Sequence, residues 1–424
     1  MHTLEDGAAP PPRGRRRHIS RAEAEKLLPK DSDGVMDAYF PKRGATCGEE
    51  HVRNVLRGPY AFMHGCARRM VAQRGMISWS GIGLFAFGDR DSKHFGAGHT
   101  ALLGQPGSGK TLLAKTAEEI LQMDPKRIQG TIDLMPSDIT GTSVLDIDEN
   151  GKRYFKFVKG PIFAKYLIVD EITRISMRSQ SAFLEAMSEG QVTWGGVTYQ
   201  ADPFIVATSN EEGVEKLLDA LSDRLMFQVR VKPFTAADFT EILYRTQDFQ
   251  RVNLAPVCDY KAVLEIRQFF HDTVHVSAEM RDFMGKLADT IGTIDGTGLL
   301  RHIREKLGFT ANDPFLKPGS WPLSGRSITH LEGAARVLAA MRYRDYVTFA
   351  DVYKVLLPII RHRTHFMPNA LSSGAREMLQ YTDTGGQLHS ELWDRFRGTG
   401  RTEMAEYLLS EIIAAAWAHV TPKE

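Results

Sequence analysis

Cysteine is scarce in this chain of 424 residues, which has only Cys47, Cys66 and Cys258. Three widely separated thiols provide neither a disulfide framework nor the ligand spacing of a zinc site, so we expect a reducing compartment. Long apolar runs are also missing. The longest one near the end, residues 412–418, is far shorter than the roughly 20 residues that span a bilayer. The N-terminus has no apolar signal-peptide core, so we expect a cytoplasmic protein without membrane insertion.

An excess of charge of one sign is absent as well. The net charge is +1, which gives the whole molecule no attraction to nucleic acid or anionic membranes. The length and the 42% hydrophobic content are typical of a globular protein with two or three domains. Residues 1–45 are proline-rich, basic and without periodicity. They predict a disordered tail, with a basic arm for an acidic partner or nucleic acid as the alternative.

The most informative stretch is residues 99–111, His-Thr-Ala-Leu-Leu-Gly-Gln-Pro-Gly-Ser-Gly-Lys-Thr. A short apolar strand, a glycine loop and a helical pattern to about Met123 follow one another, as in a phosphate-binding loop. Lys110 can reach the β- and γ-phosphates, the Thr111 hydroxyl can bind Mg²⁺, and the helix N-terminus adds its positive dipole end. The residues expected to bind the nucleotide are Gly104, Pro106, Gly107, Ser108, Gly109, Lys110, Thr111 and Leu112.

Polar side chains follow two further apolar runs. Residues 165–171 read Lys-Tyr-Leu-Ile-Val-Asp-Glu, which predicts a buried parallel strand that ends in two carboxylates. In open α/β sheets, ligands bind at this end of the strands. Asp170 suits the outer shell of Mg²⁺, and Glu171 suits a general base that activates a water. Residues 204–210 form a similar run, and Asn210 at its end could hydrogen-bond the attacking water or the γ-phosphate.

The remaining pattern predicts two hairpins and a helical second half. Residues 143–158 turn at an Asn-Gly, and residues 190–199 turn at Gly195-Gly196. The glycine- and aromatic-rich residues 79–98 are expected to form a loop. Helices are expected at 179–188, 217–225, 236–246, 260–270, 278–291, 327–341 and 349–360, with a strand at 226–231. We predict an α/β nucleotide-binding domain over 46–232, an α-helical domain over 233–365 and a helical extension over 366–424.

Several stretches resemble the MoxR-type AAA+ ATPases, from about residue 98 to 365. The similar segments are residues 134–141 (LMPSDITG), 160–164 (GPIFA), 170–174 (DEITR), 180–187 (QSAFLEAM), 189–193 (EGQVT), 344–348 (RDYVT) and 361–363 (RHR). The resemblance implies an AAA+ P-loop module with a central parallel sheet, followed by an all-α lid. It also implies that both hairpins point toward the central pore of a hexameric ring.

The same resemblance implies roles for individual residues. Lys110 and Thr111 would bind the nucleotide and Mg²⁺, Asp170 and Glu171 would form the acidic pair, and Asn210 would be the first sensor. Arg224 would be the arginine finger that reaches the neighbouring subunit's ATP, with Arg174 as the alternative. Arg326 would be the lid sensor. The implied catalytic set is therefore Lys110, Asp170, Glu171, Asn210, Arg224 and Arg326, with Thr111 and Asp170 at the metal.

The implied function is an ATPase that uses ATP and Mg²⁺, forms a homo-oligomer and remodels or activates a protein client. By resemblance, a partner with a von Willebrand factor A domain often gives access to the client. Two alternatives stay open. A nucleic-acid motor of the same clade is disfavoured by the near-neutral charge and by the lack of an aromatic and basic groove pattern. A nucleotide-gated scaffold without turnover is disfavoured by the intact pair Asp170-Glu171.

Overall fold

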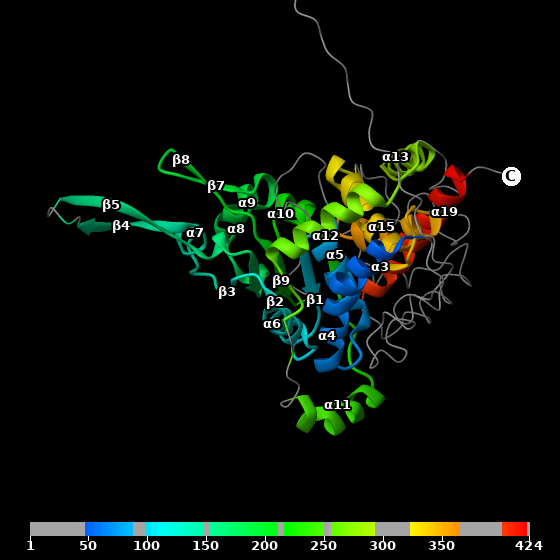
Figure 1. The fold of residues 1–424 in the computed structure, drawn as a ribbon, viewed down its shortest axis with the longest axis horizontal. Helices are drawn as coiled ribbons and strands as arrows, with labels where there is room; N and C mark the ends of the chain where they lie inside the picture. The colour runs from blue at the N-terminus through cyan, green and yellow to red at the C-terminus, as the bar shows by residue number, and fades with distance from the viewer. Residues whose placement is uncertain are drawn as a thin grey trace, which may run out of the picture.

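The computed structural model describes residues 47–87, 98–147, 149, 152–210, 216–249, 254, 256–292, 323–363 and 401–421. The predicted tail over 1–45, the connection after residue 292 and most of the C-terminal extension lie outside the described residues. Figure 1 shows a broad body, which contains the central sheet and most of the helices, and a long hairpin that projects from it.

A five-stranded parallel sheet forms the centre, in the order β10-β1-β9-β6-β3. Its strands are β1 (Thr100–Leu103), β3 (Pro125–Gln129), β6 (Tyr166–Asp170), β9 (Phe204–Ser209) and β10 (Phe227–Arg230). Every residue of β1, β6 and β9 is buried. This burial explains the continuous apolar runs in the sequence, because helices cover both faces of such a sheet.

Alternate residues of the strands contribute to two hydrophobic cores, one on each face of the sheet. On one face, Leu102, Ile168 and Val206 pack with the N-terminal helices, the helix after the phosphate loop and the lid. These N-terminal elements are α3 (Glu49–Val55), the π-helical turn η1 (Leu56–Tyr60), α4 (Ala61–Arg69), α5 (Arg74–Phe85) and α6 (Lys110–Ile120). On the other face, Leu167 and Ala207 pack with short helices. These are α7 (Pro136–Thr140), α8 (Met177–Gln180), η4 (Ser181–Phe183), α9 (Leu184–Glu189) and α10 (Asp219–Arg224).

The second half of the described chain is helical, and the five helices predicted there are confirmed. They are α11 (Ala236–Phe249), α12 (Tyr260–Thr273), α13 (Ala278–Gly292), α15 (Gly325–Met341) and α16 (Phe349–Ile360). Helix α12 packs on α3 and α5, α15 packs on α5, and α16 packs on β10, so one hydrophobic core runs across residue 232. The division into domains at residue 232 stays a prediction.

The described part of the C-terminal extension is α19 (Arg401–Val420), which packs on α13 and α16. Ile412 and Ala416 are fully buried, and the Trp417 ring lies edge-on to Phe283. The buried side chains of α19 therefore pack on the body of the molecule. Among the described helices, none combines the length and the hydropathy that crossing a bilayer requires.

The expectation of a loop over residues 79–98 is wrong for its first part, because Trp79 to Phe85 belong to α5. This helix is buried on nearly all sides, so it shows no amphipathic period. Two of its glycines, Gly81 and Gly83, serve close packing rather than turns: a Cβ on Gly83 would lie 2.5 Å from the Gly98 carbonyl oxygen. The helix after the phosphate loop also ends earlier than predicted, at Ile120, because β2 (Leu121–Gln122) pairs with β11 (Cys258–Asp259).

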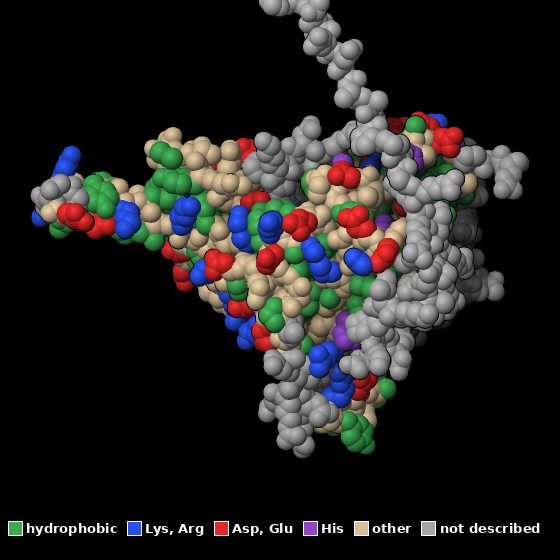
Figure 2. Space-filling model, viewed as in Figure 1, with side chains coloured by type: hydrophobic (Ala, Val, Ile, Leu, Met, Phe, Trp, Pro, Cys, Tyr) green, Lys and Arg blue, Asp and Glu red, His purple; other side chains and the backbone are tan. Residues whose placement is uncertain are grey.

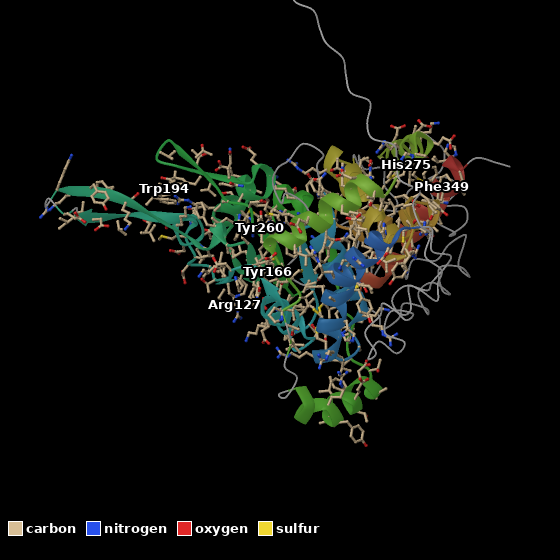
Figure 3. The ribbon with its side chains drawn as sticks, viewed as in Figure 1. Arg127, Tyr166, Trp194, Tyr260, His275 and Phe349 are labelled. Carbon is tan, nitrogen blue, oxygen red and sulfur yellow. The ribbon has the colours of Figure 1, made fainter. Side chains whose placement is uncertain are left out.

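Both predicted hairpins are present, and the second contacts the first near the base of the first. The first consists of β4 (Gly141–Ile147) and β5 (Arg153–Lys159), and the second of β7 (Gln191–Trp194) and β8 (Val197–Gln200). The Phe157 ring stacks on Trp194 and packs against Tyr199 and Phe163. We call these four rings the aromatic clasp. Figure 2 shows apolar side chains along both hairpins, and Figure 3 shows Trp194 between them.

Candidate nucleotide-binding site

Three predicted site segments meet at the carboxyl edge of the sheet. The phosphate loop follows β1, Asn210 follows β9, and Glu171 follows β6, and these three strands are adjacent. Leu103 lies opposite Ser209, and the Gly104 N–H donates to the Ser209 carbonyl oxygen at 3.1 Å. The phosphate loop and strand β9 are therefore joined by a direct hydrogen bond. This edge is where parallel α/β sheets bind their ligands.

The loop itself has the backbone of an anion cradle. Gly107 and Gly109 have φ values of 79° and 90°, which L side chains rarely adopt. Helix α6 begins at Lys110, and within the described chain no side chain caps its first turn. Its first backbone N–H groups therefore suit an anionic ligand. The Lys110 ammonium is buried and donates to the carbonyl oxygens of Gly104 (2.6 Å) and Gln105 (2.9 Å). Thr111 is half-buried on the same turn, and Leu112 is exposed.

The acidic pair is held by two residues that the sequence reasoning missed. Asp170 is buried, and each of its carboxylate oxygens accepts a hydrogen bond, Oδ1 from the Thr208 hydroxyl (3.0 Å) and Oδ2 from Arg127 Nε (2.6 Å). The Thr208 oxygen also accepts from the Glu171 N–H at 3.2 Å. Glu171 has a φ of 54°, a left-handed conformation that is rare outside glycine and often found at functional sites.

Asn210 supplies a buried acceptor at this edge. Its Oδ1 is shielded from solvent, and among the described residues nothing donates a hydrogen bond to it. An unsatisfied buried acceptor costs about 1–3 kcal/mol, which a bound ligand or ordered water can recover. A loop of N–H groups, a lysine, a hydroxyl, a carboxylate and this amide together fit Mg²⁺ and a nucleoside triphosphate. Lys110 and the loop would hold the phosphates, and Thr111 and Asp170 would hold the metal.

Arg224 lies at the amino edge of the sheet, at the other end of the strands from the phosphate loop. Helix α10 ends at Arg224 and leads into β10, whose first residue Phe227 is opposite Thr100, the first residue of β1. The Arg224 guanidinium donates to the Ser188 hydroxyl and to the Ala220 carbonyl oxygen. The structure therefore does not bring Arg224 to the phosphate loop of its own chain.

Arg326 lies beside Arg224, at this same edge. Its guanidinium forms an ion pair with Asp223 at 3.1 Å. Burial and the charge of Arg326 both lower the pKa of Arg224. Burial alone would raise the pKa of Asp223, but the hydrogen bonds from Ser324 and Arg326 keep it below its usual value. Arg174, the alternative finger, lies exposed three residues after Glu171, on the turn η3 (Ile172–Arg174).

Through Arg363, the lid is attached to the amino edge of the sheet, where Arg224 lies. The Arg363 side chain donates to the carbonyl oxygens of Asp223 (2.8 Å) and Leu225 (2.6 Å), and it contacts the buried His330. The neighbouring His362 hydrogen-bonds the Leu225 carbonyl oxygen at 2.9 Å. The Arg-His-Arg segment at 361–363 thus joins helix α16 to the residues that lead into β10.

A parallel sheet with a phosphate loop, an acidic pair, a polar sensor position and a helical lid defines a P-loop nucleotide-binding protein of the AAA type. Comparison with known families agrees. The ATPase family associated with various cellular activities (AAA) matches residues 99–227, and the AAA lid domain matches residues 320–380.

Relatives place the chain more narrowly. It is 32% identical to the chaperone MoxR1 of Mycobacterium tuberculosis, over 65% of this chain and 70% of the relative. It is 33% identical to the protein YeaC of Bacillus subtilis, over 65% and 80%. A Cytophaga hutchinsonii protein described as an ATPase has a similar structure, with a TM-score of 0.59 and 27% identity over 78% of this chain and 94% of that one. The chain belongs to the MoxR-type AAA+ ATPases.

Proposed function

We propose that this protein binds Mg-ATP and hydrolyses it to ADP and phosphate. The observation that carries the proposal is the meeting of the phosphate loop, the acidic pair and Asn210 at one sheet edge. Lys110 binds the phosphates, and Glu171 takes a proton from the attacking water. Asn210 orients that water through its Oδ1, to which none of the described residues donates a hydrogen bond. Mg²⁺, when bound, neutralises the charge that develops on the phosphates.

We further propose that the active form is a ring of several copies, hexameric as in the family. The support is geometric: Arg224 and Arg326 share an edge that faces away from their own phosphate loop. A neighbouring copy can bring both side chains to the phosphates, so we assign Arg224 as the finger in trans. Such fingers typically increase the rate by about 10³ to 10⁵. Hydrolysis should therefore depend on assembly.

For the client, we propose a protein that is remodelled or activated, with a von Willebrand factor A domain protein as partner. The name of the Mycobacterium tuberculosis relative, a chaperone, supports a protein client. The exposed apolar residues Leu145 and Phe155 on the projecting hairpin also suit contacts with a protein.

One variant tests the reaction and the client together. Glu171→Gln keeps the metal and phosphate ligands but removes the base, so it should bind ATP, release no phosphate and retain its client. The measurements are nucleotide affinity, phosphate release and recovery of bound material with ATP present. Lys110→Ala is the control and should lose nucleotide binding. Binding without phosphate release in the wild type would indicate a scaffold, and nuclease-sensitive recovery without protein would indicate a nucleic-acid motor.

A further inference from the structure

Arg127 belongs to none of the nucleotide-binding motifs described above, yet it contacts the carboxylate of Asp170, which would hold the metal. It belongs to β3, the edge strand of the sheet beside β6, where Gln129 is opposite Asp170 and Arg127 is opposite Ile168. Arg127 and Asp170 are therefore diagonal neighbours on adjacent strands, within reach of a long side chain. Figure 3 shows Arg127 at the outer margin of the body, beside the sheet.

The contact is charge-assisted and directional. Arg127 Nε donates to Asp170 Oδ2 at 2.6 Å, and its terminal NH2 nitrogen contacts the same oxygen. That nitrogen also donates to the Gln129 side-chain oxygen at 3.3 Å, which helps to fix the guanidinium plane. The Thr208 hydroxyl holds the other carboxylate oxygen. Asp170 is thus oriented from both sides, by one charged donor and one neutral donor.

This arrangement has two separable consequences for a metal at Asp170. The guanidinium fixes the carboxylate plane, so fewer orientations must be lost when the metal arrives. Its positive charge also opposes that of Mg²⁺ and weakens the attraction of the carboxylate for the metal. The Arg127 side chain is 43% exposed, so solvent screens this repulsion and the effect stays moderate.

We propose that Arg127 is a positioning residue that sets the Mg²⁺ requirement of the nucleotide site. The inference rests on the proposed function, since it assigns a Mg-nucleotide to this edge. Arg127 orients Asp170 for hydrolysis and at the same time keeps its affinity for Mg²⁺ low. Charge and geometry then have opposite effects: loss of the charge strengthens metal binding, while loss of the orientation slows turnover.

The test is the Mg²⁺ dependence of ADP binding to the full chain, followed with a fluorescent ADP. Arg127→Gln should lower the half-saturating Mg²⁺ concentration about three- to tenfold and reduce the turnover number for ATP. Arg127→Lys keeps the charge but loses the planar fork. It should therefore keep the wild-type Mg²⁺ requirement and still turn over slowly. A role in strand packing alone would not produce this difference.

Lys126→Gln is the matched control, because it removes the same charge from an exposed neighbour on the same strand. It should leave both quantities unchanged. In an Asp170→Asn background, Arg127→Gln should no longer alter the Mg²⁺ dependence. An unchanged half-saturating Mg²⁺ concentration in Arg127→Gln, or an equal decrease in Lys126→Gln, would overturn the inference and leave the proposed ATPase intact. A wild type that binds no nucleotide at any Mg²⁺ concentration would overturn both.

Discussion

At the scale of single residues, the acidic pair depends on how closely Gly130 approaches it. The Gly130 N–H donates to the Asp170 carbonyl oxygen at 2.7 Å, and a Cβ on Gly130 would lie 2.3 Å from the Glu171 carbonyl oxygen. Gly130→Ala must therefore displace the backbone of Glu171. We expect a loss of about 1–3 kcal/mol in unfolding free energy and a marked decrease in phosphate release, with nucleotide affinity retained. Denaturant titration and a phosphate-release assay measure these effects.

Gly285 provides the control for this substitution. It lies inside α13, and a Cβ there would meet nothing within 4 Å. Gly285→Ala should stabilise the protein by about 0.5–1 kcal/mol, because alanine loses less backbone entropy in a helix. If both alanine variants changed stability and phosphate release alike, the close approach at Gly130 would not be the cause.

The residues of the site differ in how far the sequence could predict them. Lys110 and Thr111 follow from local spacing, because the loop and the helix that position them are continuous in the chain. The fit of the structure to these positions supports the prediction, although their chemical roles stay proposals. Arg127 and Thr208 could not be found in this way. Their contacts with Asp170 depend on the register of three strands, and that register is set by packing between distant segments.

At the scale of elements, the projecting hairpin depends on the aromatic clasp. A two-stranded hairpin is only marginally stable alone in water, and β4–β5 has mostly exposed or half-buried residues. Its Phe157 ring packs on Trp194 and Tyr199 of the second hairpin, and Trp194 Nε1 donates to the Ser143 hydroxyl at 3.1 Å. Phe157→Ala removes these ring contacts, each worth about 0.5–1.5 kcal/mol. We expect faster hydrogen exchange throughout β4 and β5, with little change in the central sheet.

Phe155 offers a control on the same strand. It is 77% exposed and lies outside the clasp. Phe155→Ala should leave hydrogen exchange in β4 and β5 close to that of the wild type. Equal acceleration by both variants would mean that the hairpin is stabilised by its own cross-strand pairs rather than by the clasp.

Elements with a clear period or a clear turn were predictable, whereas α5 was not. The hairpins have turn residues between β-favouring runs, and the lid helices α12 and α13 have apolar faces that repeat every three to four residues. Helix α5 combines glycines with residues buried on nearly all sides. Without a polar face it shows no period, and its glycines resemble those of a loop. Only the surrounding helices and strands, which bury most of it, make its helical state favourable.

At the scale of the whole molecule, two buried histidines, His99 and His330, and the half-buried His362 lie where the lid meets the sheet. Burial and the charge of Arg267 lower the pKa of His99 to about 3. Burial and the charge of Arg363 lower the pKa of His330 and His362 well below the usual value. In the unfolded chain each histidine takes up a proton near pH 6.5. Unfolding therefore becomes more favourable as the pH falls below about 6.5.

The unfolding free energy should therefore be highest above pH 6.5 and should decrease as the pH falls toward 3. At pH 5.5 each of these histidines should reduce the unfolding free energy by about 1 kcal/mol. Denaturant titrations at pH 7.5 and pH 5.5 measure the decrease. His362→Gln keeps a side-chain donor for the Leu225 carbonyl oxygen but cannot be protonated, so its decrease should be smaller. An identical decrease in wild type and variant would contradict this explanation.

Because Arg224 and the phosphate loop lie at opposite ends of the strands, we expect two inactive variants to recover activity when they are mixed. Lys110→Ala lacks a working loop but keeps Arg224, and Arg224→Ala has the reverse defect, so each alone should be inactive. In a ring mixed in equal amounts, about a quarter of the interfaces join an intact loop to an intact finger. Phosphate release should therefore reappear on mixing.

Mixing Lys110→Ala with Glu171→Gln is the control for this recovery. Both substitutions damage the loop side of the interface, so no pairing of these two chains restores a complete site. Activity that reappeared here would indicate exchange or contamination rather than complementation. If neither mixture recovered phosphate release while Arg224→Ala still assembled, the finger would not act across the interface through Arg224. Arg174, exposed beside Glu171 at the carboxyl edge, would then be the next residue to replace.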